Sequence, residues 1–147
     1  MTLSPSHPRL PSQTRWTAYG DRTLLDYPWL EPVVISRRLD GVELETEVTR
    51  FLALAREGAV LIGGFISLGE RRVAREASAI PRCRLVYLHP WGLSRYKPHG
   101  RAAAERLASG LTLALSGFPD TEESLPRRED CLLNNRWAQT IAALRKD

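Results

Sequence analysis

The stretch Gly63-Gly64-Phe65-Ile66-Ser67-Leu68-Gly69-Glu70 has the residue types and the spacing of an anion-binding turn. An apolar run over 59–62 leads into it, and a helical pattern over 71–80 follows it. Glycines let the backbone come close to a phosphate, and the first N–H groups and the dipole of the next helix then face that phosphate. The order of strand, glycine turn and helix therefore predicts a phosphate site at Gly63, Gly64 and Ser67.

The same residues also fit a structural role. Ser67 and Glu70 have the S-x-x-E spacing of a capping box, in which each side chain satisfies a free amide at the other position. Two glycines after a strand are typical of a turn. The spacing matches neither G-x-G-x-x-G nor G-x-x-x-x-G-K-[ST], which argues against a dinucleotide-binding Rossmann site and a P-loop NTPase. Ligand binding and helix capping both remain open on this motif.

Length and composition restrict the class of protein. The 147 residues suit one domain, and 43% hydrophobic with 26% charged residues is ordinary for a globular protein. No apolar run approaches the roughly 20 residues that cross a bilayer, and the first residues lack the apolar core of a signal peptide. Cys83 and Cys131 are isolated and the three histidines are scattered, so we expect neither metal nor cofactor. We expect a cytoplasmic protein that makes no membrane contact.

The basic residues are nearly all arginine. The net charge is +4, and of 21 basic residues only Lys97 and Lys146 are lysine. Arginine offers a planar fork to phosphate oxygens, although a G+C-rich genome produces the same bias without a functional cause. The charge therefore permits a nucleic-acid partner and does not require one.

The order of the elements indicates an α/β fold. Residues 1–14 are rich in proline and serine and contain no acid, which predicts a flexible tail before a domain over 15–147. The segment 16–32 reads as an entry segment on the domain edge. After it, continuous apolar strands alternate with helical patterns, as in βαβ units whose parallel sheet is buried on both faces. We expect a single Rossmann-like domain with a mainly parallel sheet and helices on both faces. The expected strands are 33–35, 59–62, 85–88 and 111–115, and the expected helices are 40–57, 71–80, 101–109 and 129–144.

Ligands of such sheets bind beyond the carboxyl ends of the strands. This rule brings the residues after each strand to one edge of the sheet. Trp91 and Phe118 are candidates there for stacking on a base, although aromatic residues after strands commonly cap the core. Arg71, Arg72 and Arg75 share one face of the helix over 71–80, either as a solvated face or as a contact for a single strand. The segments gathered at the edge are Ser36 to Arg38, Gly63 to Glu70, His89 to Trp91 and Ser116 to Phe118.

In this order the segments resemble the DprA/Smf family of DNA-processing proteins and the wider SLOG superfamily of Rossmann-like nucleotide binders, from about Gly20 onward. Ser36-Arg37 is similar to the family's G-S-R, and Gly63 to Glu70 to its S-G-x-x-x-G-[IV]-D turn. Ser116-Gly117-Phe118 is similar to S-E/S-P-F, and Asn134-Asn135-Arg136 stands where the family has R-N-R. The resemblance implies a protein that binds a nucleotide or single-stranded DNA. It implies a site made of Ser36, Arg37, Gly63, Gly64, Ser67, Ser116, Gly117, Asn135 and Arg136.

The glycine stretch also resembles a second branch of that superfamily, the LOG-type phosphoribohydrolases, which carry P-G-G-x-G-T-x-x-E. The chain keeps both glycines, a hydroxyl and the acid at matching spacing, in Gly63, Gly64, Ser67 and Glu70. This resemblance implies an alternative function, hydrolysis of the N-glycosidic bond of a nucleoside monophosphate with Glu70 as the catalytic residue. Whether the protein is an enzyme stays open here, and so does a homodimer.

Overall fold

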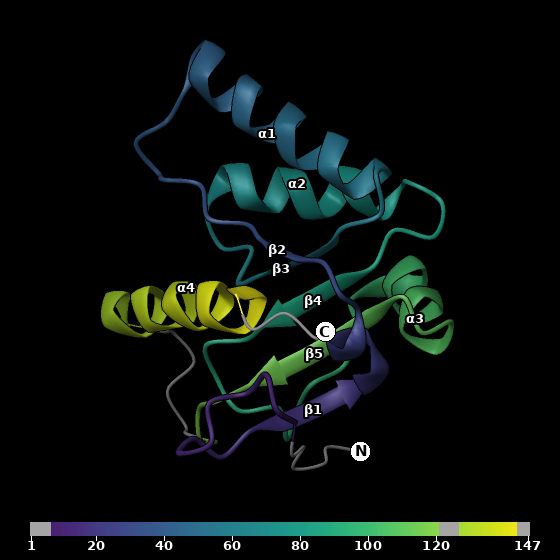
Figure 1. The fold of residues 1–147 in the computed structure, drawn as a ribbon, viewed down its shortest axis with the longest axis vertical. Coiled ribbons are helices and arrows are strands. Elements are labelled where there is room, and N and C mark those ends of the chain that lie inside the picture. The colour runs from purple at the N-terminus through teal and green to yellow at the C-terminus, as the bar shows by residue number, and fades with distance from the viewer. Residues whose placement is uncertain (1–6, 121–126, 144–147) are drawn as a thin grey trace.

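The computed structural model describes residues 7–120 and 127–143, which form one five-stranded sheet with helices on both faces (Figure 1). The strand order is β1-β5-β4-β3-β2, with β2 to β5 parallel and β1 antiparallel to β5. The strands are β1 (Thr17–Gly20), β2 (Leu30–Pro32), β3 (Val60–Gly63), β4 (Leu85–Leu88) and β5 (Thr112–Ser116). The helices are η1 (Arg22–Asp26, a 3-10 helix), α1 (Gly41–Arg56), α2 (Leu68–Ser78), α3 (Gly100–Ala108) and α4 (Arg128–Ala143).

The predicted α/β class and mainly parallel sheet are confirmed. Every residue of β3 and of β5 is buried, which explains why these strands read as continuous apolar runs. The predicted bounds of the first parallel strand are wrong by three residues: we expected 33–35, whereas β2 covers 30–32. The error is small in space, since the Val33 amide still donates to the Ile62 carbonyl at 2.8 Å. The expected entry segment contains β1 and η1, which are too short for a periodic pattern to predict.

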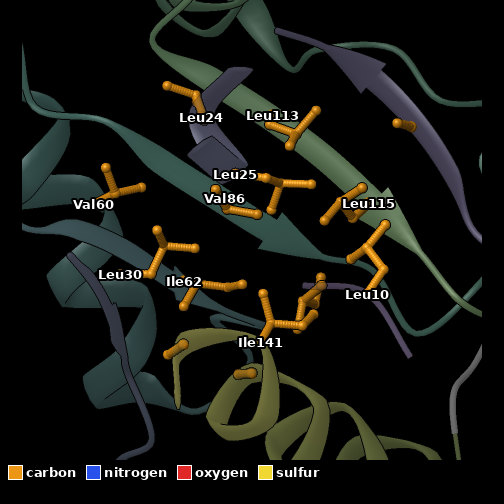
Figure 2. Packing of buried hydrophobic residues seen from close by; sticks show 14 of the residues in the cluster. Leu10, Leu24, Leu25, Leu30, Val60, Ile62, Val86, Leu113, Leu115 and Ile141 are labelled. Atoms are coloured by element: carbon orange, nitrogen blue, oxygen red, sulfur yellow. The ribbon is translucent and has the colours of Figure 1, made fainter. Parts of the chain in front are cut away.

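One core cluster fills the space between the sheet and α4. Leu10, Leu115 and Ile141 belong to it, and Figure 2 shows these side chains between the strands and the last helix. Leu10 lies in the segment that we expected to be a tail, yet only 6% of it is exposed. Nearby, the Trp16 indole N–H donates to the Pro11 carbonyl at 3.1 Å. Leu10 and Pro11 thus have contacts with the domain, while residues 1–6 of the predicted tail over 1–14 lie outside the described residues.

The second core cluster lies on the opposite face, under α1 and α2. It joins Phe51 of α1 and Val73 of α2 to Leu61 and Leu85 of the central strands. Figure 1 shows these two helices stacked together on the β2–β3 side of the sheet. The alanine-rich α3 differs from them, because none of its residues 100–108 is buried. The sheet beside α3 is therefore covered more loosely than the sheet beneath α1 and α2.

Candidate nucleic-acid interface

The carboxyl ends of β2 to β5 meet at one edge of the sheet, because these strands are parallel. The His89 amide donates to the Leu115 carbonyl at 2.8 Å, which fixes the segment after β4 beside the end of β5. A Cβ added to Gly64 would lie 3.5 Å from the Leu88 carbonyl oxygen. The structure thus brings Ser36, Gly64, His89 and Ser116 to the same edge, where the sequence placed them.

Glu70 ties the glycine turn to the loop after β2. Its carboxylate accepts one backbone amide at each oxygen, from Ile35 at 3.0 Å and from Ile66 at 3.1 Å. Ser67 is the N-cap of α2, and its hydroxyl accepts the Glu70 amide at 3.2 Å. Half of the predicted capping box is present as expected, while the Glu70 side chain reaches Ile66 and Ile35 instead of the Ser67 amide. With 4% of its surface exposed, Glu70 acts as a positioning residue of the turn.

The backbone of the turn is strained at a residue that is not glycine. Phe65 has a φ of 52°, in the left-handed region that side chains rarely adopt. Its ring packs on Tyr87 at 4.8 Å between centroids, and the side chain is buried. Such strain costs on the order of 1–3 kcal/mol and clusters at functional sites. The core contact of Phe65 thus holds the turn in a shape that its own backbone disfavours.

Asn134 is a residue of this edge that the sequence did not single out. It lies on α4 with 1% of its surface exposed, and its amide nitrogen donates to the Leu88 carbonyl at 2.6 Å. Its Oδ1 is buried and has no hydrogen-bond partner in the part of the chain that the structure describes. A Cβ on Gly64 would lie 3.5 Å from the Asn134 Nδ2, so the amide stands beside the glycine turn. No spacing in the sequence distinguishes Asn134 from Asn135, which the resemblance selected and which is only half-buried.

The arginines of the edge are exposed and carry unbalanced charge. Arg37 and Arg136 form no ion pair among residues 7–120 and 127–143. The acids nearest to Arg136 in sequence, Glu129 and Asp130, pair with Arg127 at 3.0 and 3.4 Å. Arg37 lies near Cys131 of α4, where its charge opposes the burial that raises the pKa of that thiol. Arg37 thus lies near the first turn of α4.

Other predicted site residues have mainly local roles in the structure. The Ser116 hydroxyl is buried and accepts the Phe118 amide at 3.1 Å, as in a tight turn. A Cβ on Gly117 would lie 2.8 Å from the Trp137 ring, so this glycine allows close packing. The Phe118 ring also packs on Trp137, at 5.1 Å between centroids, and Gly63 is buried in β3. The exposed Ser36 hydroxyl accepts the Arg38 amide at 3.1 Å.

Within the described residues, no group of three or more His, Cys, Asp or Glu side chains is arranged to hold a metal ion. No helix in that part of the chain has the length and apolar character needed to cross a membrane.

Comparison with solved structures connects this architecture to known proteins. The chain superposes on DNA processing protein A from Helicobacter pylori, described for its mode of binding single-stranded DNA, with a TM-score of 0.70 and 20% identity. It has the fold of the matched part of DNA processing protein A. The structure of that protein from Streptococcus pneumoniae superposes with a TM-score of 0.64 and 16% identity. Each superposition covers 97% of this chain, which spans 65% and 51% of the two solved chains. No protein-family model and no curated protein sequence matches the chain.

Proposed function

We propose that this chain is a DprA-like protein of the SLOG type that binds single-stranded DNA or a nucleotide at the carboxyl edge of its sheet. The observation that carries the proposal is the superposition of 97% of the chain on the Helicobacter pylori protein, which is described as binding single-stranded DNA. The unpaired arginines at the edge supply the charge that a phosphate backbone requires.

The glycine turn is the proposed phosphate contact. The Glu70 amide is already held by the Ser67 hydroxyl, whereas the amides of Leu68 and Gly69 have no acceptor within the helix by its geometry. The dipole of α2 adds partial positive charge at that point. Gly64 carries no side chain between the backbone and a ligand. A phosphate over this turn would therefore meet free donors.

Asn134 and the arginines complete the proposed site. The unpartnered Asn134 Oδ1 is an acceptor, so it suits a hydroxyl or amino group of a nucleotide and not its phosphate. Arg37 and Arg136 are the proposed charge partners of the phosphates. The hydrolase alternative finds no support, because both oxygens of Glu70 already hold backbone amides. A cytoplasmic location and a homodimer remain predictions from the sequence.

The test measures how the affinity for a fluorescent oligo-dT depends on salt. The wild type should lose affinity with a log–log slope of about −0.7 per neutralised phosphate. Replacing Arg37 and Arg136 together by alanine should flatten that slope. The matched control replaces Arg22 and Arg56, which are exposed and lie near the opposite edge of the sheet, and it should keep the wild-type slope. Equal slopes for the two double variants, or no binding at low salt, would contradict the proposal.

A further inference from the structure

A groove separates α2 from α3 on the face of the sheet opposite α4. Its volume is about 940 Å³, near the upper end of the range for small-molecule sites. It extends from His89 and Trp91, beyond the end of β4, to Ser78 and Leu111 near the starts of β4 and β5. Four of the nine residues of α3, which forms one wall of the groove, are alanine, and none of its residues 100–108 is buried. We call this space the α2–α3 groove.

Aromatic rings line one part of the groove. His89 packs against Tyr96 at 5.3 Å, Trp91 at 5.7 Å and Tyr87 at 6.1 Å between ring centroids. Tyr96 is held from behind by Tyr19 at 5.2 Å. Trp91 is 43% exposed, so its ring is accessible to a ligand. Such a set of partly exposed rings offers a flat ligand stacking partners on more than one side.

His89 adds a polar atom to this aromatic wall. Its Nε2 is buried and has no hydrogen-bond partner within residues 7–120 and 127–143. Burial, and to a smaller extent the charge of His99, lowers the pKa of His89 to about 4. The imidazole is therefore neutral at pH 7, where it offers one donor and one acceptor and repels no cation.

Basic side chains line the rest of the groove. Arg106 is fixed there, because its Nη2 donates to the Cys83 and Leu111 carbonyls at 2.7 and 3.1 Å. Among residues 7–120 and 127–143, Glu105 is the one acidic residue in the lining. None of the basic residues of the lining forms an ion pair with an acid in the described part of the chain. They are Arg75, Arg82, Arg95, Lys97 and Arg106.

The groove reaches the carboxyl edge at His89, but it does not contain the proposed DNA contacts. None of the residues proposed to contact DNA, namely Arg37, Gly64, Asn134 and Arg136, lines it. The groove pairs stacking surfaces with an excess of positive charge and a neutral imidazole. A flat ring bearing an anionic group fits this combination, whereas an apolar ligand would leave the cations unused.

We propose that the α2–α3 groove is a second binding site that takes a nucleotide unit, with the base among Tyr87, Trp91 and Tyr96 and the phosphate toward Arg106. The proposal does not depend on DNA binding at the carboxyl edge. The nucleotide unit has two sources, a free nucleoside monophosphate or the terminal nucleotide of a strand.

The test uses two variants of α3 that differ by one position. Ala103 is half-buried and lines the groove, whereas its neighbour Ala104 is exposed and does not. Ala103→Glu and Ala104→Glu change the net charge equally, and glutamate is a good helix former. Calorimetric titration with dAMP at low salt should show binding to the wild type. Ala103→Glu should weaken it about tenfold or more, because a carboxylate then faces the phosphate, while Ala104→Glu keeps the wild-type affinity.

A second variant tests the aromatic wall separately. Tyr96→Leu keeps an apolar side chain but removes one ring, and it should weaken dAMP about fivefold or more, in line with the loss of base stacking. A 5′-phosphorylated oligo-dA then identifies the source. If Ala103→Glu weakens the oligomer too, the groove takes a strand end; if only dAMP is weakened, the groove takes the free nucleotide. Both results support the site.

Three results would overturn the groove site. They are no binding of dAMP to the wild type, equal binding by the two glutamate variants, or loss of dAMP binding on replacing Arg37 and Arg136. The last result would assign the nucleotide to the carboxyl edge and leave DNA binding there intact, so the two proposals fail separately.

Discussion

The Glu70 carboxylate accepts a hydrogen bond from the backbone amide of Ile35, at 3.0 Å and across 35 positions of sequence. Through this bond a buried acid at the start of α2 fixes the loop that carries Ser36 and Arg37. The same carboxylate holds the glycine turn through the Ile66 amide. The two segments that form one side of the carboxyl edge therefore share a single anchor.

Replacing Glu70 by glutamine should destabilise the fold by about 1–3 kcal/mol. The NH2 group of glutamine would face the backbone N–H of Ile35 or of Ile66 in a buried site, where two donors cannot form a hydrogen bond. Urea unfolding measures this change. Glu76→Gln is the matched control. Within the described residues the Glu76 side chain pairs with Arg72 alone, at the surface, so this change should alter stability by less than about 0.5 kcal/mol. Equal stability of the two variants would show that Glu70 is not an anchor.

Leu10→Ala should lower the free energy of unfolding by about 2–3 kcal/mol, the low end for a buried leucine because a terminal segment relaxes around the cavity. The reason is its place in the core beside Leu115 and Ile141. Thermal and urea unfolding report the loss, with the exposed Leu68→Ala as a control that stays near the wild type. If Leu10→Ala also stays near the wild type, the flexible tail extends past residue 10, as the sequence indicated.

His89 should make stability depend on pH below neutrality. Its pKa is about 4 in the folded protein and 6.5 in the unfolded chain, so the unfolded state takes up the proton first. Stability is therefore full above about pH 6.5, falls as the pH drops toward 4, and has lost about 3 kcal/mol below that. Urea unfolding at several pH values, for the wild type and for His89→Asn, should show that the variant lacks this decline. Parallel curves would exclude His89 as the source.

Two adjacent glycines should respond differently to alanine. A Cβ on Gly63 would lie 2.8 Å from the backbone oxygen of Val33, so Gly63→Ala should cost about 1–3 kcal/mol. A Cβ on Gly64 meets nothing nearer than 3.4 Å, so Gly64→Ala should leave stability within about 0.5 kcal/mol. Gly64→Ala should nevertheless weaken oligo-dT if the backbone there approaches a phosphate. The idea fails if the order of melting temperatures is reversed, or if Gly64→Ala binds DNA normally.

The sequence alone determined the class of fold and the position of the glycine turn. Strands buried on both faces must be apolar throughout, and helices must repeat their apolar residues every three or four positions. Both kinds of element can therefore be recognised from the local sequence pattern. The hydrogen bond from the Glu70 amide to the Ser67 hydroxyl could also be predicted from the sequence, because the start of a helix places those two groups together. For the carboxyl edge, parallel strands were enough to predict which segments meet.

Which polar groups at that edge are buried, and what they contact, depends on how distant segments pack together. The Glu70 carboxylate binds the Ile35 amide, and the Ser116 hydroxyl binds the Phe118 amide. The residue that donates to the Leu88 carbonyl is Asn134 and not Asn135. None of these contacts follows from local spacing. Leu10 lies in the core with Leu115 and Ile141, which are more than 100 positions away in sequence. The α2–α3 groove likewise depends on how far α3 stands from the sheet. Local patterns record backbone periodicity, whereas burial depends on distant segments that meet only when the chain has folded.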